Sequence, residues 1–312
     1  MYKKTHKACA KVVLFGEYGA LLGYKALVAS IDRFAQCHFS TAPKLSFIGI
    51  ANNNIIENSP IFNAVIKASS DLKINIAHGK YVIDTSDFFT SDNKKLGIGS
   101  SSAALVALCK SIIYHGKNHH SALIFALKAN YYLSNGLGSG IDIIAAFAKG
   151  INKINTKNIL NYKQISHKKA INFWSNIYII YTNKEQTTNS FTKLFWQQKN
   201  ISKIKNILKN NNILYNKIFK NKYYKNDNLL IDIINRIDNN MYDMQNLCSF
   251  KFITDEHIKI SDLAKKCFGA AKISGAGGGD ISLAYIPKNN HNNFIKEINN
   301  HNYTIIKAYI NK

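Results

Sequence analysis

A glycine-rich run near the C-terminal end of the chain limits what that segment can become. Residues 272–280 read Lys-Ile-Ser-Gly-Ala-Gly-Gly-Gly-Asp, with four glycines in five positions. Glycine weakens the interior of helices and strands, but it adopts φ > 0 readily and lets another group approach the backbone amides. The run therefore predicts a turn, which either binds an anion such as phosphate or simply joins two strands.

A second segment, rich in glycine and serine, comes before a predicted helix. Residues 97–103 read Gly-Ile-Gly-Ser-Ser-Ser-Ala, and apolar residues then recur at helical spacing as far as Gly116. The first amides of a helix have no partner within it and the helix dipole adds positive charge, so such a segment can bind an anion. The residues alone also fit a simpler role for these serines, in which Ser100 or Ser101 only caps the helix.

These two segments resemble two signatures of the GHMP kinases, a family of small-molecule kinases. The family's nucleotide loop is close to Gly-Leu-Gly-Ser-Ser-Ala-Ala, and a glycine turn lies near its C-terminus. Its third signature is a lysine-containing strand that ends in Gly-Glu-His or Gly-Glu-Tyr. Residues 11–18 match it, although Cys9-Ala10 stands where Pro-Gly often precedes the lysine. Residues 97–103 fit neither a Walker loop nor a dinucleotide fingerprint. With three motifs in the family's order, the chain is identified as a member of the family.

Within the family, the chain most resembles the phosphomevalonate kinases. Gly-Glu-Tyr at 16–18, Gly-Ser-Gly-Ile-Asp at 138–142 and Asp280 at the end of the glycine turn are closer to that branch than to mevalonate kinases. Lys184 and Thr188 are similar to its Lys-Ser-x-Ser-Thr segment. The resemblance implies transfer of a phosphoryl group from ATP, with Mg²⁺, to phosphomevalonate, which gives diphosphomevalonate.

The resemblance also implies roles for particular residues. Lys11 would be the cation at the transferred phosphoryl group, and Asp142 would be the catalytic carboxylate. The segment 97–103, here called the serine loop, would bind the nucleotide, and Ser101 would also bind Mg²⁺. Its nucleotide-binding residues would be Gly97, Gly99, Ser100, Ser101, Ser102 and Ala103. Phosphate or substrate binding falls to Glu17, Tyr18, Ser139, Gly140, Lys184, Thr188, Ser274, Gly275, Ala276, Gly277, Gly278 and Asp280.

Structural alternatives exist for three of these residues. Lys11 fits a solvent-facing strand end, Asp142 fits an N-cap for the apolar segment that follows it, and Glu17 fits a structural role. A phosphate-monoester acceptor is largely ionised at pH 7, so in a phosphomevalonate kinase Asp142 would orient Lys11 or the metal rather than take a proton.

Other functions also stay open: mevalonate kinase, another GHMP kinase acting on a small alcohol, or a catalytically inactive nucleotide-binding relative. Tyr131 stands where mevalonate kinases carry a Mg²⁺-binding glutamate, which disfavours the first of these.

Composition argues against other partners. The net charge of +23 comes almost entirely from lysine, because Arg33 and Arg236 are the only arginines. Arginine is the preferred residue for reading phosphates and bases, so no nucleic-acid partner is expected. Abundant Asn, Lys, Ile and Tyr indicate an A/T-rich genome. Five cysteines without C-x-x-C spacing indicate neither disulfides nor zinc. We expect a cytoplasmic protein without a membrane partner; the oligomeric state is left open.

The order of patterns predicts an α+β protein with two domains, residues 1–165 and 166–312, divided near a lysine-rich polar stretch at 150–170. The resemblance implies the two-domain GHMP kinase fold: an N-terminal β-α-β domain with a left-handed crossover, and a ferredoxin-like C-terminal domain with the glycine turn. Periodicity predicts helices over 60–72 and 121–133, a strand over 177–181 and a last strand around 304–309.

Overall fold

The structure is a computed structural model of the whole chain. It describes residues 4–52, 54–116, 121–184, 188–220 and 226–311.

The chain divides into two compact units. The first contains residues 1–12, 30–149 and 311–312, and the second contains residues 13–29 and 150–310. Strands β1 (Lys4–Phe15) and β2 (Ala26–Ser40) each contribute residues to both units. Residues 150–165 fall in the second unit because β6 there pairs with the start of β2. The domain limits at 165 that the sequence suggested stay a prediction.

The first unit contains a mixed sheet. Its strands lie in the order β4 (Asn54–Ile56), β3 (Ser46–Ala51), β5 (Lys80–Asp84) and β2, and β1 also pairs with β2. The pairs β3–β4 and β2–β5 are antiparallel, whereas β3 and β5 are parallel. Helix α1 (Pro60–Asp71) lies between β3 and β5 in the chain and completes a β-α-β connection, as the resemblance implied. The handedness of this crossover stays a prediction.

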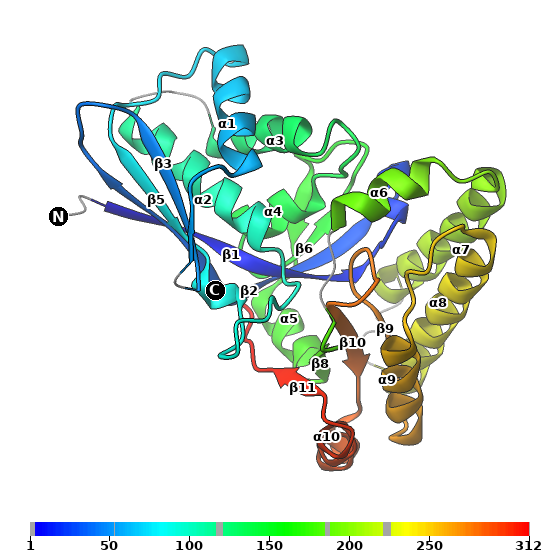
Figure 1. Cartoon of the computed structure of the whole chain (residues 1–312). Helices are drawn as coiled ribbons and strands as arrows, with labels where there is room; N and C mark the ends of the chain where they lie inside the picture. The colour runs from blue at the N-terminus through cyan, green and yellow to red at the C-terminus, as the bar shows by residue number, and fades with distance from the viewer. Residues whose placement is uncertain (1–3, 53, 117–120, 185–187, 221–225, 312) are drawn as a thin grey trace. The chain divides into compact units, whose positions relative to one another are not determined.

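Three further helices complete the first unit: α2 (Ser100–His115), α3 (Ala122–Leu133) and α4 (Ile141–Phe147). Helix α2 carries apolar side chains on all of its faces, and its residues 102–109 are all buried. A helix with this composition belongs in a core. Accordingly α2 packs against α3, α4 and β5, while α1 packs against α3 (Figure 1). The short 3₁₀ helix η2 (Ser86–Phe88) follows β5. The start of α2 is therefore set on a rigid, buried element.

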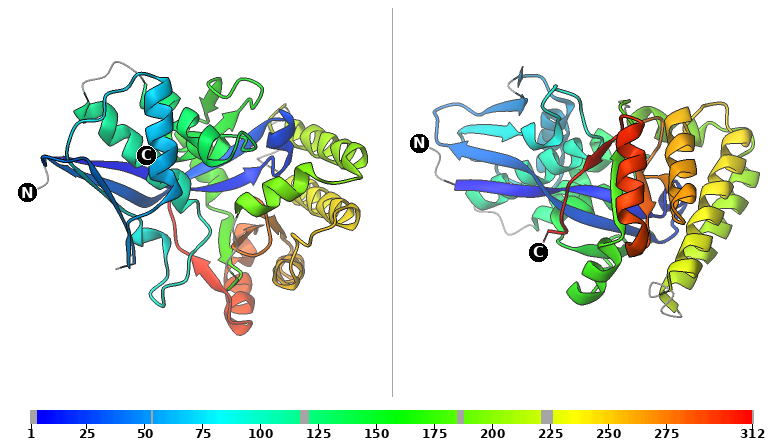
Figure 2. Two further views of the ribbon diagram at one scale, coloured as in Figure 1. Left: turned by 45° about the horizontal axis from the view of Figure 1, so that its top comes forward. Right: turned by 90° about the horizontal axis from the view of Figure 1, so that it is seen from below.

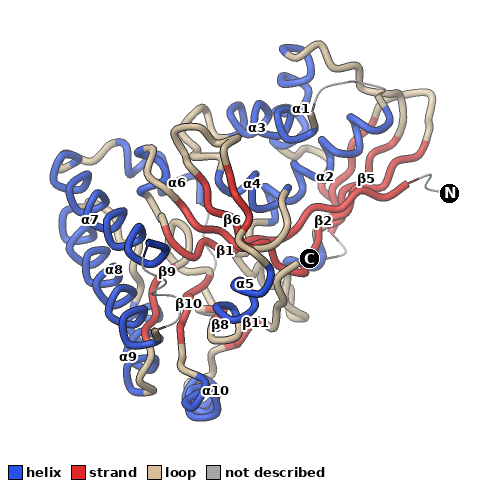
Figure 3. The backbone as a smooth tube through the Cα atoms, turned by 180° about the vertical axis from the view of Figure 1, so that it is seen from behind, coloured by secondary structure: helices blue, strands red, loops and turns tan. Residues whose placement is uncertain are grey.

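The second unit contains a four-stranded antiparallel sheet. Its strands lie in the order β11 (Thr304–Ile306), β8 (Ile177–Tyr181), β10 (Ile281–Tyr285) and β9 (Ala270–Ile273). In chain order this is 4-1-3-2, the arrangement of a ferredoxin-like β-α-β-β-α-β fold. Helices α9 (Asp255–Lys266) and α10 (His291–Asn300) pack on it around Ile180, Ile260, Leu263, Phe294 and Ile298. The expected ferredoxin-like domain is confirmed (Figure 3).

The rest of the second unit is mostly helical. Helices α7 (Ile201–Lys220) and α8 (Asp227–Leu247) form a long hairpin, which both views of Figure 2 show side by side. The remaining elements are η1 (Gly19–Leu22), β6 (Ile151–Ile154), β7 (Tyr162–Gln164), α5 (His167–Trp174), α6 (Thr188–Trp196) and η4 (Lys288–Asn290). In the described part of the chain, no helix combines the length and the apolar character needed to cross a membrane.

One expectation about an element was wrong. The last strand ends at Ile306 and not near 309, and its pairing with β8 covers only residues 304–306. The polar stretch 150–170, for which no element was predicted, contains β6, β7 and the start of α5. The predicted helix at 60–72 and strand at 177–181 are confirmed by α1 and β8.

Candidate active site

Lys11 and Asp142 form an ion pair within the first unit. The Lys11 Nζ atom lies 3.1 Å from Oδ1 of Asp142, and the two side chains are 10% and 37% exposed. Lys11 is held in β1, where its backbone N–H donates to the Ile98 carbonyl at 2.9 Å. Asp142 is in the first turn of α4, which begins after Gly140 at φ 74°. Lys11 is therefore not a solvent-facing strand end, and Asp142 is not the N-cap.

The serine loop meets the same lysine. Gly99, at φ 88°, is the N-cap of α2, so Ser100 and Ser101 lie inside the first turn and do not cap the helix. Ser100 is buried, Ser101 is exposed, and the Ser102 hydroxyl donates to the Gly99 carbonyl at 3.0 Å. A Cβ atom on Gly99 would come within 2.8 Å of the Lys11 side chain. The lysine thus runs past the helix start, where the first amides have no intrahelical partner.

The other predicted residues of the first unit lie in the two turns. Gly97, at φ 69°, precedes the helix start, and the Ala103 N–H donates to the Gly99 carbonyl at 3.1 Å. Ser139 is half-buried and directly precedes Gly140. Ser139 therefore lies in the turn before α4, next to Gly140, the N-cap of the helix that carries Asp142.

In the second unit, Tyr18 and Ser274 contact the protein's own backbone. The Tyr18 hydroxyl donates to the Ala276 carbonyl at 2.6 Å, and burial raises its pKa well above the usual value, so it stays a donor. The Ser274 hydroxyl donates to the Val13 carbonyl at 3.0 Å and accepts the Val13 N–H at 3.1 Å. Because its one proton is used in this way, Ser274 has no donor left for a phosphate.

Glu17 is also engaged inside the second unit. Its carboxylate forms an ion pair with Lys272, and both side chains are 3% exposed. This contact agrees with the structural alternative for Glu17 and disagrees with direct substrate binding.

The glycine turn is shaped by packing against Phe252. Gly275, Gly277 and Gly278 have φ values of 85°, 74° and 81°. A Cβ atom on Gly277 would lie 2.3 Å from the Phe252 carbonyl oxygen, and the Gly278 N–H donates to that same oxygen at 2.6 Å. The expectation that both glycines leave their backbone open to phosphate is therefore wrong for the Gly278 amide, which already has a protein partner.

Asp280 and Lys184 lie side by side beyond the turn. The Asp280 N–H donates to the Lys184 carbonyl at 2.7 Å, and the Asp280 carbonyl accepts from Thr182. The Lys184 ammonium is 2.7 Å from Glu256, whose hydrogen bond raises the lysine pKa. Thr188 begins α6, but its side chain lies outside what the structure describes. These residues support the turn through backbone contacts.

His257 is a buried histidine close to the glycine turn. It is the third residue of α9, and its Nδ1 accepts the Thr254 N–H at 3.1 Å as part of a capping box. Burial lowers its pKa to about 4, although the nearby backbone of Gly279 and Ile281 acts in the opposite direction. The side chain is therefore neutral in the folded protein at neutral pH.

Acidification is expected to destabilise the protein through His257. Its folded pKa of about 4 lies below the usual 6.5, so as pH falls from 6.5 towards 4 the unfolded chain takes up the proton first. The free energy of unfolding should fall by roughly 3 kcal/mol across this window. His257→Gln keeps an acceptor for the capping box and should remove this part of the pH dependence.

Urea unfolding of the wild type, His257→Gln and the exposed control His78→Gln at several pH values measures this effect. Equal pH dependence in all three proteins would show that His257 is not held neutral.

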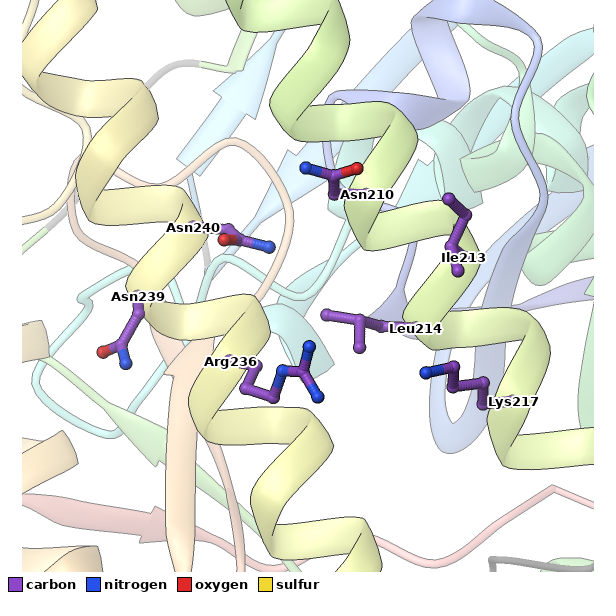
Figure 4. Close-up of a pocket in the computed structure, with 7 residues that line it drawn as sticks. All are labelled: Asn210, Ile213, Leu214, Lys217, Arg236, Asn239 and Asn240. Carbon is purple, nitrogen blue, oxygen red and sulfur yellow. The ribbon is translucent and has the colours of Figure 1, made fainter.

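A hollow of about 430 Å³ lies between α7 and α8 (Figure 4). The side chains around it include Lys217, Arg236 and three asparagines, Asn210, Asn239 and Asn240. None of them belongs to the three motifs.

The sequence analysis missed three residues beside the predicted ones. Lys272 was given no role, although a lysine within the apolar strand Ala270–Ile273 indicates a buried charge that needs a partner. Phe252 and Glu256 had no local signal, because their contacts come from distant parts of the chain.

The chain is similar to known kinases in sequence and in fold. No protein-family model matches the chain. It is 27% identical over 222 residues to a phosphomevalonate kinase from Saccharolobus solfataricus; the match covers 65% of this chain and 64% of that protein, slightly under two thirds of each. The structure of Streptococcus pneumoniae phosphomevalonate kinase with phosphomevalonate and AMPPNP has a TM-score of 0.80 at 14% identity, covering 98% of this chain and 99% of the other. Methanococcus jannaschii mevalonate kinase has a TM-score of 0.75 at 18% identity, covering 100% and 99%.

The structural matches show the GHMP kinase fold. Together with the three ordered motifs and the sequence match, they support a resemblance to the GHMP kinases. Within that family its sequence is similar to phosphomevalonate kinase.

Proposed function

We propose that this chain is an ATP-dependent kinase that converts phosphomevalonate to diphosphomevalonate. The observation that carries the proposal is the Lys11–Asp142 ion pair at the start of α2. The similarity to phosphomevalonate kinase supports the choice of acceptor. We expect such an enzyme to act in the cytoplasm on small molecules alone.

The start of α2 and Lys11 would bind and neutralise phosphates. Phosphoryl transfer depends mainly on alignment of the reacting oxygens and on neutralisation of the developing charge. The amides of residues 100–102 point out of the helix start, and the Lys11 side chain passes beside Gly99. Bound ATP would therefore place negative charge against three backbone donors and one ammonium group.

Two oxygen-bearing side chains of the first unit fit Mg²⁺. The Ser101 hydroxyl is exposed in the first turn of α2, and the Asp142 carboxylate is partly exposed in the first turn of α4. Mg²⁺ prefers oxygen ligands and is usually held by one or two protein groups together with substrate phosphates. When bound, the ion would neutralise charge on the phosphates. Among the described residues no cluster of three His, Cys, Asp or Glu side chains forms a separate metal site.

Asp142 is arranged to orient Lys11 rather than to take a proton. Its Oδ1 atom faces the Lys11 ammonium at 3.1 Å. This charge-assisted contact holds the ammonium group in place. A phosphate-monoester acceptor needs no strong base, because it is largely ionised at pH 7. The pair therefore suits phosphomevalonate better than the hydroxyl of mevalonate.

The proposal is tested by measuring ADP release with phosphomevalonate, with mevalonate and without acceptor, each with and without Mg²⁺. We expect Mg²⁺-dependent turnover that is much faster with phosphomevalonate, and a product that carries a diphosphate. Preferred turnover of mevalonate would make the chain a mevalonate kinase. Turnover of neither acceptor would refute the proposed activity and leave only the family.

A further inference from the structure

Two motifs that are far apart in the chain are tied together in the second unit. Residues 13–18 end β1 and form the Gly-Glu-Tyr turn, and residues 272–276 end β9 and begin the glycine turn. Three contacts, here called the turn clamp, join them: Val13 with Ser274, Tyr18 with Ala276, and Glu17 with Lys272. The start of the glycine turn is thus attached at three successive places.

The ion pair is the buried centre of the turn clamp. Glu17 and Lys272 are each 3% exposed. The Lys272 Nζ atom also donates to the Ile273 carbonyl at 3.0 Å and lies 5.5 Å from the centre of the Phe15 ring. A buried charge that loses its partner is strongly unfavourable, so each residue restricts where the other can lie.

A second carboxyl group lies near Lys272. Asp238 is 3% exposed and accepts a hydrogen bond from the Ser261 hydroxyl at 2.9 Å. Burial raises its pKa to about 6, while Lys272 acts to lower it. Removal of the Lys272 charge therefore affects two buried carboxyl groups, whereas removal of the Glu17 charge leaves Lys272 with Asp238 nearby. We expect the lysine variant to be the more damaging.

We propose that Lys272 is a positioning residue, which acts through Glu17 to hold the glycine turn in the conformation used for catalysis. Glu17, Tyr18 and Ser274 are then parts of the turn clamp and not ligands of the substrate. The inference rests on the proposed kinase function for its activity readout only.

A double-mutant cycle tests the turn clamp. The variants are Lys272→Met, Glu17→Gln and the double variant, with Lys272→Arg as the conservative change. Lys266→Met is the matched control, since it removes an exposed lysine that pairs with Glu297 at 2.8 Å. We expect Lys272→Met to lower kcat/KM for ATP about 100-fold, the scale of a slightly misplaced catalytic geometry. The double variant should recover part of this loss, because the buried carboxylate of Glu17, which loses its partner in Lys272→Met, is then absent as well. Lys272→Arg should retain more activity than Lys272→Met.

Hydrogen exchange of the backbone amides of residues 275–280 gives a readout that needs no catalysis. Exchange should be faster in Lys272→Met than in the wild type, slower again in the double variant, and unchanged in Lys266→Met. If the variants show this exchange pattern but the wild type has no kinase activity, the proposed function is refuted, while the role of Lys272 in positioning the glycine turn is supported.

Three results would overturn the proposal that Lys272 positions the glycine turn through Glu17. The first is a double variant no better than Glu17→Gln in activity, with a raised KM for the acceptor, which would make Glu17 a substrate ligand. The second is unchanged exchange at residues 275–280 in Lys272→Met. If a single variant fails to fold, the third is a double variant that is no more stable than that single variant.

Discussion

Lys11→Met is expected to lower kcat by about 10²- to 10³-fold while the melting temperature stays close to that of the wild type. The Lys11 side chain passes beside Gly99 at the start of α2, and removal of a single group that stabilises transition-state charge typically costs about 10²- to 10³-fold. Asp142 is 37% exposed, so water can solvate its carboxylate when the lysine is gone. Steady-state rates at saturating ATP and acceptor, together with thermal melts, measure both effects.

Lys67→Met is the control for this variant, because it removes an exposed lysine from α1 of the same unit. Asp142→Asn completes the series. If Asp142 only orients Lys11, Asp142→Asn should cost less than the roughly 10²- to 10⁴-fold typical of a lost general base, and its pH–rate profile should match the wild type. Wild-type rates in Lys11→Met would remove Lys11 from the mechanism.

Gly277→Ala is expected to destabilise the second unit by about 2–5 kcal/mol, through the cost of a left-handed backbone together with that of overpacking. The new Cβ would lie 2.3 Å from the Phe252 carbonyl oxygen, at a position whose φ is +74°. The obstructing atom belongs to the backbone and cannot rotate away. The hydrogen bond from Gly278 to the same carbonyl should be lost with it. Urea unfolding gives the change in the free energy of unfolding.

Gly23→Ala separates the two causes. Gly23 has a similar φ of +80°, but its added Cβ would meet only the flexible side chain of Lys157, at 3.1 Å. It should therefore show the backbone strain alone, about 1–2 kcal/mol. Equal losses in the two variants would mean that Phe252 does not restrict the glycine turn. A Gly277→Ala protein of normal stability but poor ATP use would instead support the phosphate role expected from the sequence.

Local structure was largely predictable from local patterns. The helix at 60–72 and the strand at 177–181 carry the apolar periodicity of their type. The glycine run is a turn between two strands, as four glycines in five positions predict. The start of α2 was found from its glycines and serines, although Gly99 rather than a serine is the N-cap. The strands at 151–154 and 162–164 were missed because they are short and their sequence is rich in polar residues.

The sequence by itself therefore determined the strongly patterned helices and strands, the order of the three motifs and the family they resemble, since all of these depend on runs of neighbouring residues. Only the tertiary structure decided which partners the motif residues contact. Glu17 and Tyr18 find their partners 255 and 258 residues away, and Ser274 finds its partner across 261 residues. The apolar strand around Lys272 indicates that this lysine is buried, but nothing local identifies Glu17 as its partner. Only the fold brings the partner close and removes the solvent, and removal of solvent makes the pairing of a buried charge obligatory.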